Sequence, residues 1–66
     1  MGERTTVDTA AAAVAVGRKP TTIRKWVQWG WVRRAGRDGR RGLVDLEDVL
    51  LANRALEAGD TPRRPS

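Results

Sequence analysis

A break between two helix-compatible segments is the feature that most restricts how this chain can fold. Gly17 follows an alanine-rich stretch, and Pro20 comes three residues later. Glycine is favoured just after a helix, where φ is often positive, and proline is favoured at the first helical position. Proline also disfavours helical backbone in the preceding residue, which makes Lys19 the boundary. The sequence therefore predicts two short helices separated by about three residues.

The first helix is expected over Thr9–Val16 and the second from about Pro20 to Trp29. Asp8 is a good N-cap for the first, because its carboxylate can accept hydrogen bonds from free amides of the next turn. Gly30 ends the second. The second helix places apolar side chains at i, i+3 and i+4, which defines a buried stripe of Ile23, Trp26 and Val27. Two short helices with this break are typical of a helix-turn-helix.

A β-hairpin is expected next, with strands in Trp31–Ala35 and Arg41–Val44. Asp38 and Gly39 lie between them and form a dipeptide that favours a tight turn. Three glycines in this region could also suggest a phosphate-binding loop, but their spacing matches no nucleotide motif. The hairpin is the better interpretation.

A last helix follows, capped by Asp45 and ending near Ala58. Asp48, three residues after Asp45, resembles the second member of a capping box. The apolar face of this helix is predicted to comprise Leu46, Val49, Leu50 and Leu56. The fold class is thus mostly α with a small β-hairpin: three short helices plus a two-stranded wing, a winged helix-turn-helix. It spans residues 7–58, with disordered segments at 1–6 and 59–66.

Composition excludes several classes of function. The 66 residues include no cysteine and no histidine, so the chain lacks disulfides, thiolate metal ligands and the commonest general base. We expect no enzyme activity, no metal and no cofactor. No apolar run approaches the ~20 residues that span a bilayer, so we expect no membrane partner and a cytoplasmic, nucleoid-associated protein.

Positive charge is concentrated in the middle of the chain. Residues 18–41 contain nine of the thirteen basic side chains and one acid, a net charge of +8 in a chain of net charge +5. Such a concentration predicts a polyanionic partner, and double-stranded DNA is the first choice.

Within this window the second helix is expected to enter the major groove and the hairpin to reach the flanking minor groove. Arg24 is the first choice as a base reader, followed by Gln28 and Thr21, whereas Lys25 is assigned to phosphate. Arg33 and Arg34 are neighbours on a strand, so they cannot both face the same phosphates. The full set of predicted DNA-binding residues is Arg18, Lys19, Thr21, Thr22, Arg24, Lys25, Gln28, Arg37, Arg40 and Arg41.

The three tryptophans are expected to differ in role. Trp26 lies on the apolar stripe and is predicted to be core. Trp29 and Trp31 cannot both be fully buried in so small a domain, and packing against the hairpin or a neighbouring molecule is favoured over base stacking.

Several of these residues match a known pattern. Ala12-Ala13, Gly17, Thr22-Ile23, Trp26, Gly30 and Val32 fit the spacing A-A-x-x-x-G-x-x-x-x-T-I-x-x-W-x-x-x-G-x-L/V. This pattern resembles the DNA-binding domain of MerR-like winged helix-turn-helix proteins, especially small single-domain excisionases and BldC-like regulators. Lys19-Pro20 in place of a Ser-led cap, and Val44 in place of an aromatic, depart from it.

The resemblance implies a recombination directionality factor of the excisionase type or a small transcriptional regulator. It also implies binding as a monomer or as head-to-tail copies, with an integrase as a further partner. Because the chain ends before a dimerisation helix, we expect no small-molecule effector. The alternatives are the DNA-recognition domain of a phage terminase small subunit and, in a different class, a protein-interaction adaptor that uses Trp29 and Trp31.

Overall fold

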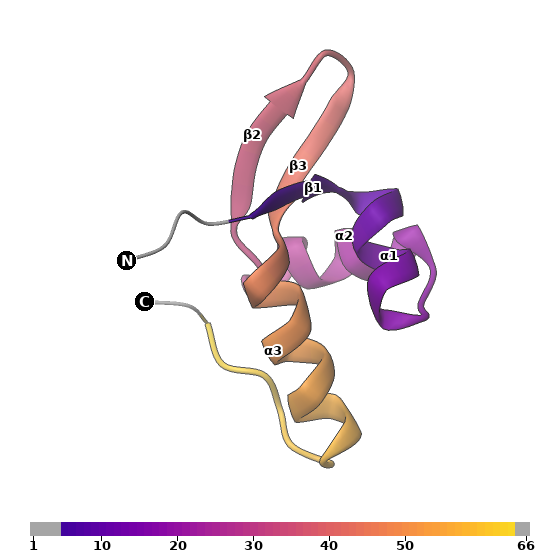
Figure 1. The fold of residues 1–66 in the computed structure, drawn as a ribbon. Coiled ribbons are helices and arrows are strands. Elements are labelled where there is room, and N and C mark those ends of the chain that lie inside the picture. Colours follow the sequence, from indigo (N-terminus) through magenta and orange to yellow (C-terminus); the bar gives the residue numbers. More distant parts are fainter. Residues whose placement is uncertain (1–4, 65–66) are drawn as a thin grey trace.

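The computed structural model describes residues 5–64. Within this range, three helices and a three-stranded antiparallel sheet form a small mixed α/β domain (Figure 1). The elements follow in the order β1 (Thr6–Asp8), α1 (Thr9–Val16), α2 (Pro20–Gln28), β2 (Arg34–Asp38), β3 (Arg41–Asp45) and α3 (Leu46–Glu57).

The predicted helices are confirmed, with bounds set by local chemistry. The Asp8 carboxylate accepts a 2.7 Å hydrogen bond from the Ala11 amide at the start of α1. Gly17 ends α1 with φ 69°, in the left-handed region. Pro20 begins α2, and Gly30, with φ 84°, follows its end.

The strand β1 was not predicted. It pairs with β3, so that the sheet order is β1-β3-β2. Val7 lies opposite Val44, and the Leu46 amide donates to the Thr5 carbonyl at 2.9 Å. Ordered structure therefore begins within the segment 1–6 that was predicted as disordered, because a partner strand almost forty residues away supplies the hydrogen bonds. Residues 1–4 lie outside the described residues.

The hairpin is present, but its turn is displaced by one residue from the prediction. Asp38 pairs with Arg41, so the loop consists of Gly39 and Arg40 rather than Asp38 and Gly39. Gly39 has φ 64°, and positive φ in the described residues is confined to glycines. Positive φ at the first central position alone is the pattern of a type II′ turn, whose twist matches that of paired strands.

The core lies where the helices meet the base of the sheet. Its buried apolar side chains are Ala12, Ala13, Ile23, Trp26, Val32, Val44, Val49 and Ala52. Trp26 is therefore core, as predicted. Val49, predicted on the apolar face of α3, is buried together with Ala52, whereas Leu50, predicted on the same face, is 44% exposed.

The segment after α3 also differs from the expected disordered tail. Residues 60–64 run back along α3 (Figure 1), and Pro62 is buried. The Arg64 side chain approaches Gly30 so closely that a Cβ there would lie 3.0 Å from Arg64 Nε. Residues 65–66 of the predicted tail lie outside the described residues.

Candidate nucleic-acid interface

An open groove of about 760 Å³ lies between α2, the hairpin and the start of α1. Five arginines and one aspartate line it, which gives the groove a net charge of +4. The basic side chains come from α2 and from both strands and the turn of the hairpin: Arg24, Arg34, Arg37, Arg40 and Arg41. Four of these five belong to the predicted DNA-binding set, and the exception is Arg34.

The exposed face of α2 points away from the core. Successive helical residues are rotated by about 100°, so Thr21 and Gln28 lie nearly opposite the buried Ile23 and Trp26. Arg24 is displaced to the side of Val27, and both residues line the groove with the hairpin. Lys25 is displaced to the other side. The helix thus presents Thr21 and Gln28 centrally, with one cation on each flank.

A β-bulge in β2 determines which hairpin arginines share a face. Arg34 lies opposite Val44 and Arg37 lies opposite Gly42, so three steps along β2 correspond to two along β3. The extra residue lies in the stretch that includes Gly36, whose φ is 104°. Without it, Arg34 and Arg37 would point to opposite faces of the sheet, because side chains alternate along a strand. With it, both lie on the face that lines the groove.

Asp8 is the acidic residue of the groove, and both its oxygens are engaged. Oδ1 caps α1, and Oδ2 accepts from Arg41 Nη1 at 3.2 Å. The Arg41 side chain is 75% exposed, so this is a surface ion pair of small energy. Part of the charge of Arg41 is therefore offset within the protein.

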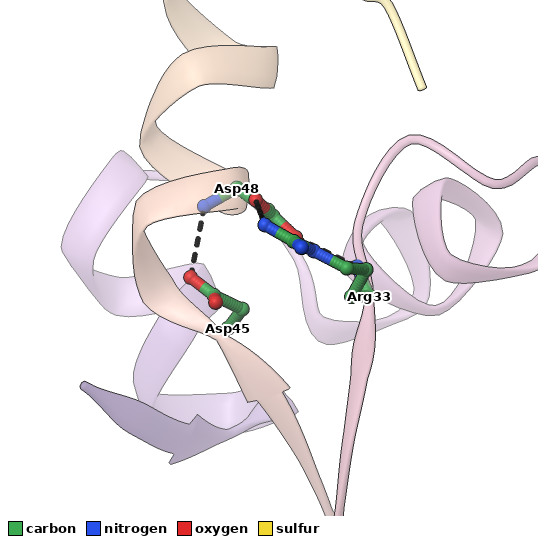
Figure 2. Close-up of polar contacts among 3 residues, drawn as sticks. All are labelled: Arg33, Asp45 and Asp48. Carbon is green, nitrogen blue, oxygen red and sulfur yellow. Dashed lines mark hydrogen bonds and ion pairs between the residues drawn. The ribbon is translucent and has the colours of Figure 1, made fainter. Parts of the chain in front are cut away.

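Arg33 and Arg34 have different surroundings. Strand alternation predicted that they could not both face the same phosphates, and the structure shows which of them lines the groove. The Arg33 side chain binds Asp48 of α3 through Nε–Oδ2 at 2.9 Å and Nη2–Oδ1 at 3.2 Å (Figure 2). The Arg33 amide donates to the same Oδ2 at 3.0 Å. Asp48 is 4% exposed, so this cluster fixes the base of β2 to α3. Arg33 is a structural residue, whereas Arg34 faces the groove.

The capping box predicted from Asp45 and Asp48 is present only in part. Asp45 caps α3 as expected, because its Oδ1 accepts from the Asp48 amide at 3.2 Å (Figure 2). The second half of the motif differs from a capping box: the Asp45 amide donates to the Arg33 carbonyl, and the Asp48 carboxylate accepts from Arg33. The hydrogen bond to Asp48 raises the pKa of Arg33 above its ordinary value, against a lowering by desolvation.

The residues before α2 lie at the edge of this surface. Lys19 is exposed at the N-cap position without a side-chain cap, and Thr22 is half-buried. Arg18 turns toward α3, where its Nε donates to Asn53 Oδ1 at 2.6 Å, and its guanidinium lies 5.3 Å from the centre of the Trp26 ring. These contacts give Arg18 a role in packing that the sequence did not indicate.

Trp29 and Trp31 contact each other, with ring centres 4.9 Å apart in an edge-to-face arrangement. Trp31 packs against the core, and Trp29 remains 49% exposed. Neither lines the groove. Their position separates them from the basic surface.

Sequence reasoning missed two charged residues of the groove, Arg34 and Asp8. Asp8 was identified only as a cap, and its contact with Arg41 spans 33 residues, which no local pattern reveals. Arg34 could be assigned only once the bulge and the partner of Arg33 were known.

Comparison with protein-family models, with curated proteins and with solved structures found no match to this chain. Among residues 5–64, no helix is long and apolar enough to cross a membrane. The same residues contain no group of three acidic, cysteine or histidine side chains that could bind a metal ion.

Proposed function

We propose that this protein binds double-stranded DNA sequence-specifically as a MerR-like winged helix-turn-helix. In this proposal α1 and α2 form the helix-turn-helix, and the β2–β3 hairpin is the wing. The helix α2 enters the major groove and the wing reaches the flanking minor groove. The observation that carries the proposal is the groove in which Arg24 of α2 and four hairpin arginines meet.

The charge and shape of this surface support a duplex rather than a small anion. The groove is open, and its cations come from two elements: α2, in the body of the domain, and the hairpin, which extends away from the helices (Figure 1). An α-helix fits the major groove, where side chains reach base edges, and arginines favour the negative potential of the minor groove. A small-molecule site would instead be enclosed and largely apolar.

Selection from a random-sequence duplex pool, followed by footprinting on DNA of the source genome at two salt concentrations, tests the proposal. We expect a defined protected sequence and a log–log salt slope of roughly −5 to −6, from about five to seven neutralised phosphates. Binding without sequence preference that vanishes as salt rises would remove the claim of specificity. Absence of duplex binding at moderate salt would instead favour a protein-interaction adaptor.

The biological process follows from the position of the footprint. Protection beside an attachment site next to an integrase gene favours an excisionase-type recombination directionality factor. Protection at a promoter without recombination favours a transcriptional regulator.

A further inference from the structure

We infer that the arginine-lined groove between α2 and the hairpin binds one sugar–phosphate strand of the duplex, and that Arg24 contacts phosphate rather than a base. This inference rests on the proposed function, since it specifies how the same surface would meet DNA. It assigns a ligand to the groove and changes the role predicted for Arg24.

The geometry of duplex DNA supplies the first step. Adjacent major and minor grooves are separated by a single backbone strand. If α2 enters one groove and the hairpin the next, that strand must pass between the two elements. The space between them is the groove lined by Arg24 and Val27 on one side and by the hairpin on the other.

The lining of the groove matches a sugar–phosphate chain. Its lining includes five arginines, which can bind phosphate oxygens bidentately. The lining also includes the half-buried Val27 and Leu43, which offer apolar surface to deoxyribose. Cations and apolar side chains in one groove fit a chain in which phosphates and sugars alternate.

The same geometry indicates which exposed residues of α2 contact phosphate and which reach base edges. Arg24 lies on the flank of α2 toward the hairpin, beside Val27, and lines the groove, so its position is beside the backbone strand rather than at the centre of the face that enters the major groove. Thr21 and Gln28 occupy the centre of the exposed face. They, rather than Arg24, are therefore the residues placed to read bases.

Asp8 makes Arg41 the weakest member of the groove. Its Oδ2 already binds Arg41 Nη1, so a phosphate gains less from Arg41 than from an arginine that has no carboxylate beside it. The strand is bound chiefly by Arg24, Arg34, Arg37 and Arg40.

The test measures affinity for a mixed-sequence duplex of about 30 base pairs by fluorescence anisotropy between about 50 and 200 mM salt. Arg24→Ala and Arg34→Ala are each expected to weaken binding about tenfold at low salt and to reduce the slope by about 0.9. Arg41→Ala should reduce the slope by less. Arg54→Ala, on the exposed part of α3 and outside the groove, is the matched control and should leave the slope unchanged.

The second readout is the ratio of the affinities for a selected sequence and for a mixed sequence. On the duplex recovered by selection and on the mixed-sequence duplex, Arg24→Ala should weaken binding by the same factor, whereas Gln28→Ala should weaken binding only to the selected one. Thermal melting of each variant establishes that it is folded.

The outcomes separate this inference from the proposed function. If the unmodified protein binds no duplex, the proposed function itself fails. If it binds, but Arg24→Ala and Arg34→Ala behave like Arg54→Ala, the groove is not the backbone site. If Arg24→Ala abolishes discrimination and leaves the mixed-sequence slope unchanged, Arg24 reads a base and the inference is overturned.

Discussion

The two ends of the β2–β3 hairpin are built in opposite ways. At its base, Val44 is buried, Asp45 caps α3, and the residue before β2, Arg33, binds the buried Asp48. At its tip, residues 36–42 are all exposed and extend away from the helices (Figure 1). Stability is concentrated at the base and positive charge at the tip.

This difference shows how residues of the same type can acquire different roles. Arg33 and Arg34 are adjacent and chemically identical, yet Arg33 fixes the sheet to α3 and Arg34 lines the basic groove. A buried carboxylate within reach of one of them makes the distinction. Substitutions in the Arg33–Asp48 cluster should therefore affect folding, and substitutions of the groove arginines should affect binding.

The largest effect is expected at the base, from Asp48→Ala. This change removes the acceptor of three hydrogen bonds from Arg33, one of them from its main-chain amide. We expect Tm to fall by on the order of 10 °C in thermal melting followed by circular dichroism. Glu47→Ala, one residue earlier and exposed, is the matched control. Equal melting of the two variants would contradict the structural role of Asp48.

Gly36→Ala tests the bulge that connects base and tip. Gly36 has φ 104°, which an alanine adopts only with strain, although no atom lies within 4 Å of the added Cβ. We expect a loss of about 1–2 kcal/mol in urea unfolding and weaker duplex binding, because relaxation of the bulge turns Arg34 away from Arg37.

Gly42→Ala is the control for that variant. A Cβ added at Gly42 would also have no atom within 4 Å, but Gly42 has no positive φ. Stability should rise by up to about 1 kcal/mol, since alanine restricts the unfolded chain without strain in the folded one. A loss as large as that of Gly36→Ala would show that strain at φ 104° is not the cause.

Substitution of Asp8 should reduce stability by less. Two variants separate the contribution of Oδ1, which caps α1, from that of Oδ2, which binds Arg41. Asp8→Ala removes the cap of α1 and should cost about 1 kcal/mol in urea unfolding. Asp8→Asn preserves the cap and loses only the exposed ion pair with Arg41, so its cost should be a few tenths of a kcal/mol. If both variants lose the same stability, the ion pair and not the cap is the main contribution.

The smallest change in stability is expected at the tip, from Arg40→Ala. Arg40 is an exposed turn residue, so unfolding should shift by less than about 0.5 kcal/mol. Duplex affinity should nevertheless fall several-fold at low salt, through loss of one cation from the groove. A Tm as low as that of Asp48→Ala would show that the tip contributes to folding after all.

The sequence alone determined the helices, because their boundaries depend on residues close by in the chain. Asp8, Gly17, Pro20 and Asp45 each act on amides or dihedral angles within three residues. The apolar stripe of α2 follows in the same way from helical periodicity, and so does the burial of Trp26. The existence of the hairpin was also predictable, from glycine and aspartate between two strand-compatible segments.

Only the tertiary structure decided the features that join distant segments. The strand β1 exists because β3 offers it hydrogen bonds, and the turn lies at Gly39 and Arg40 because the pairing of β2 with β3 sets the register. The bulge at Gly36 and the ion pair of Arg33 with Asp48 then assign one arginine to the scaffold and the next to the groove. The physical reason is that local dihedral preferences act within a few residues, whereas pairing register and the partner of a charge depend on contacts between segments far apart in the chain.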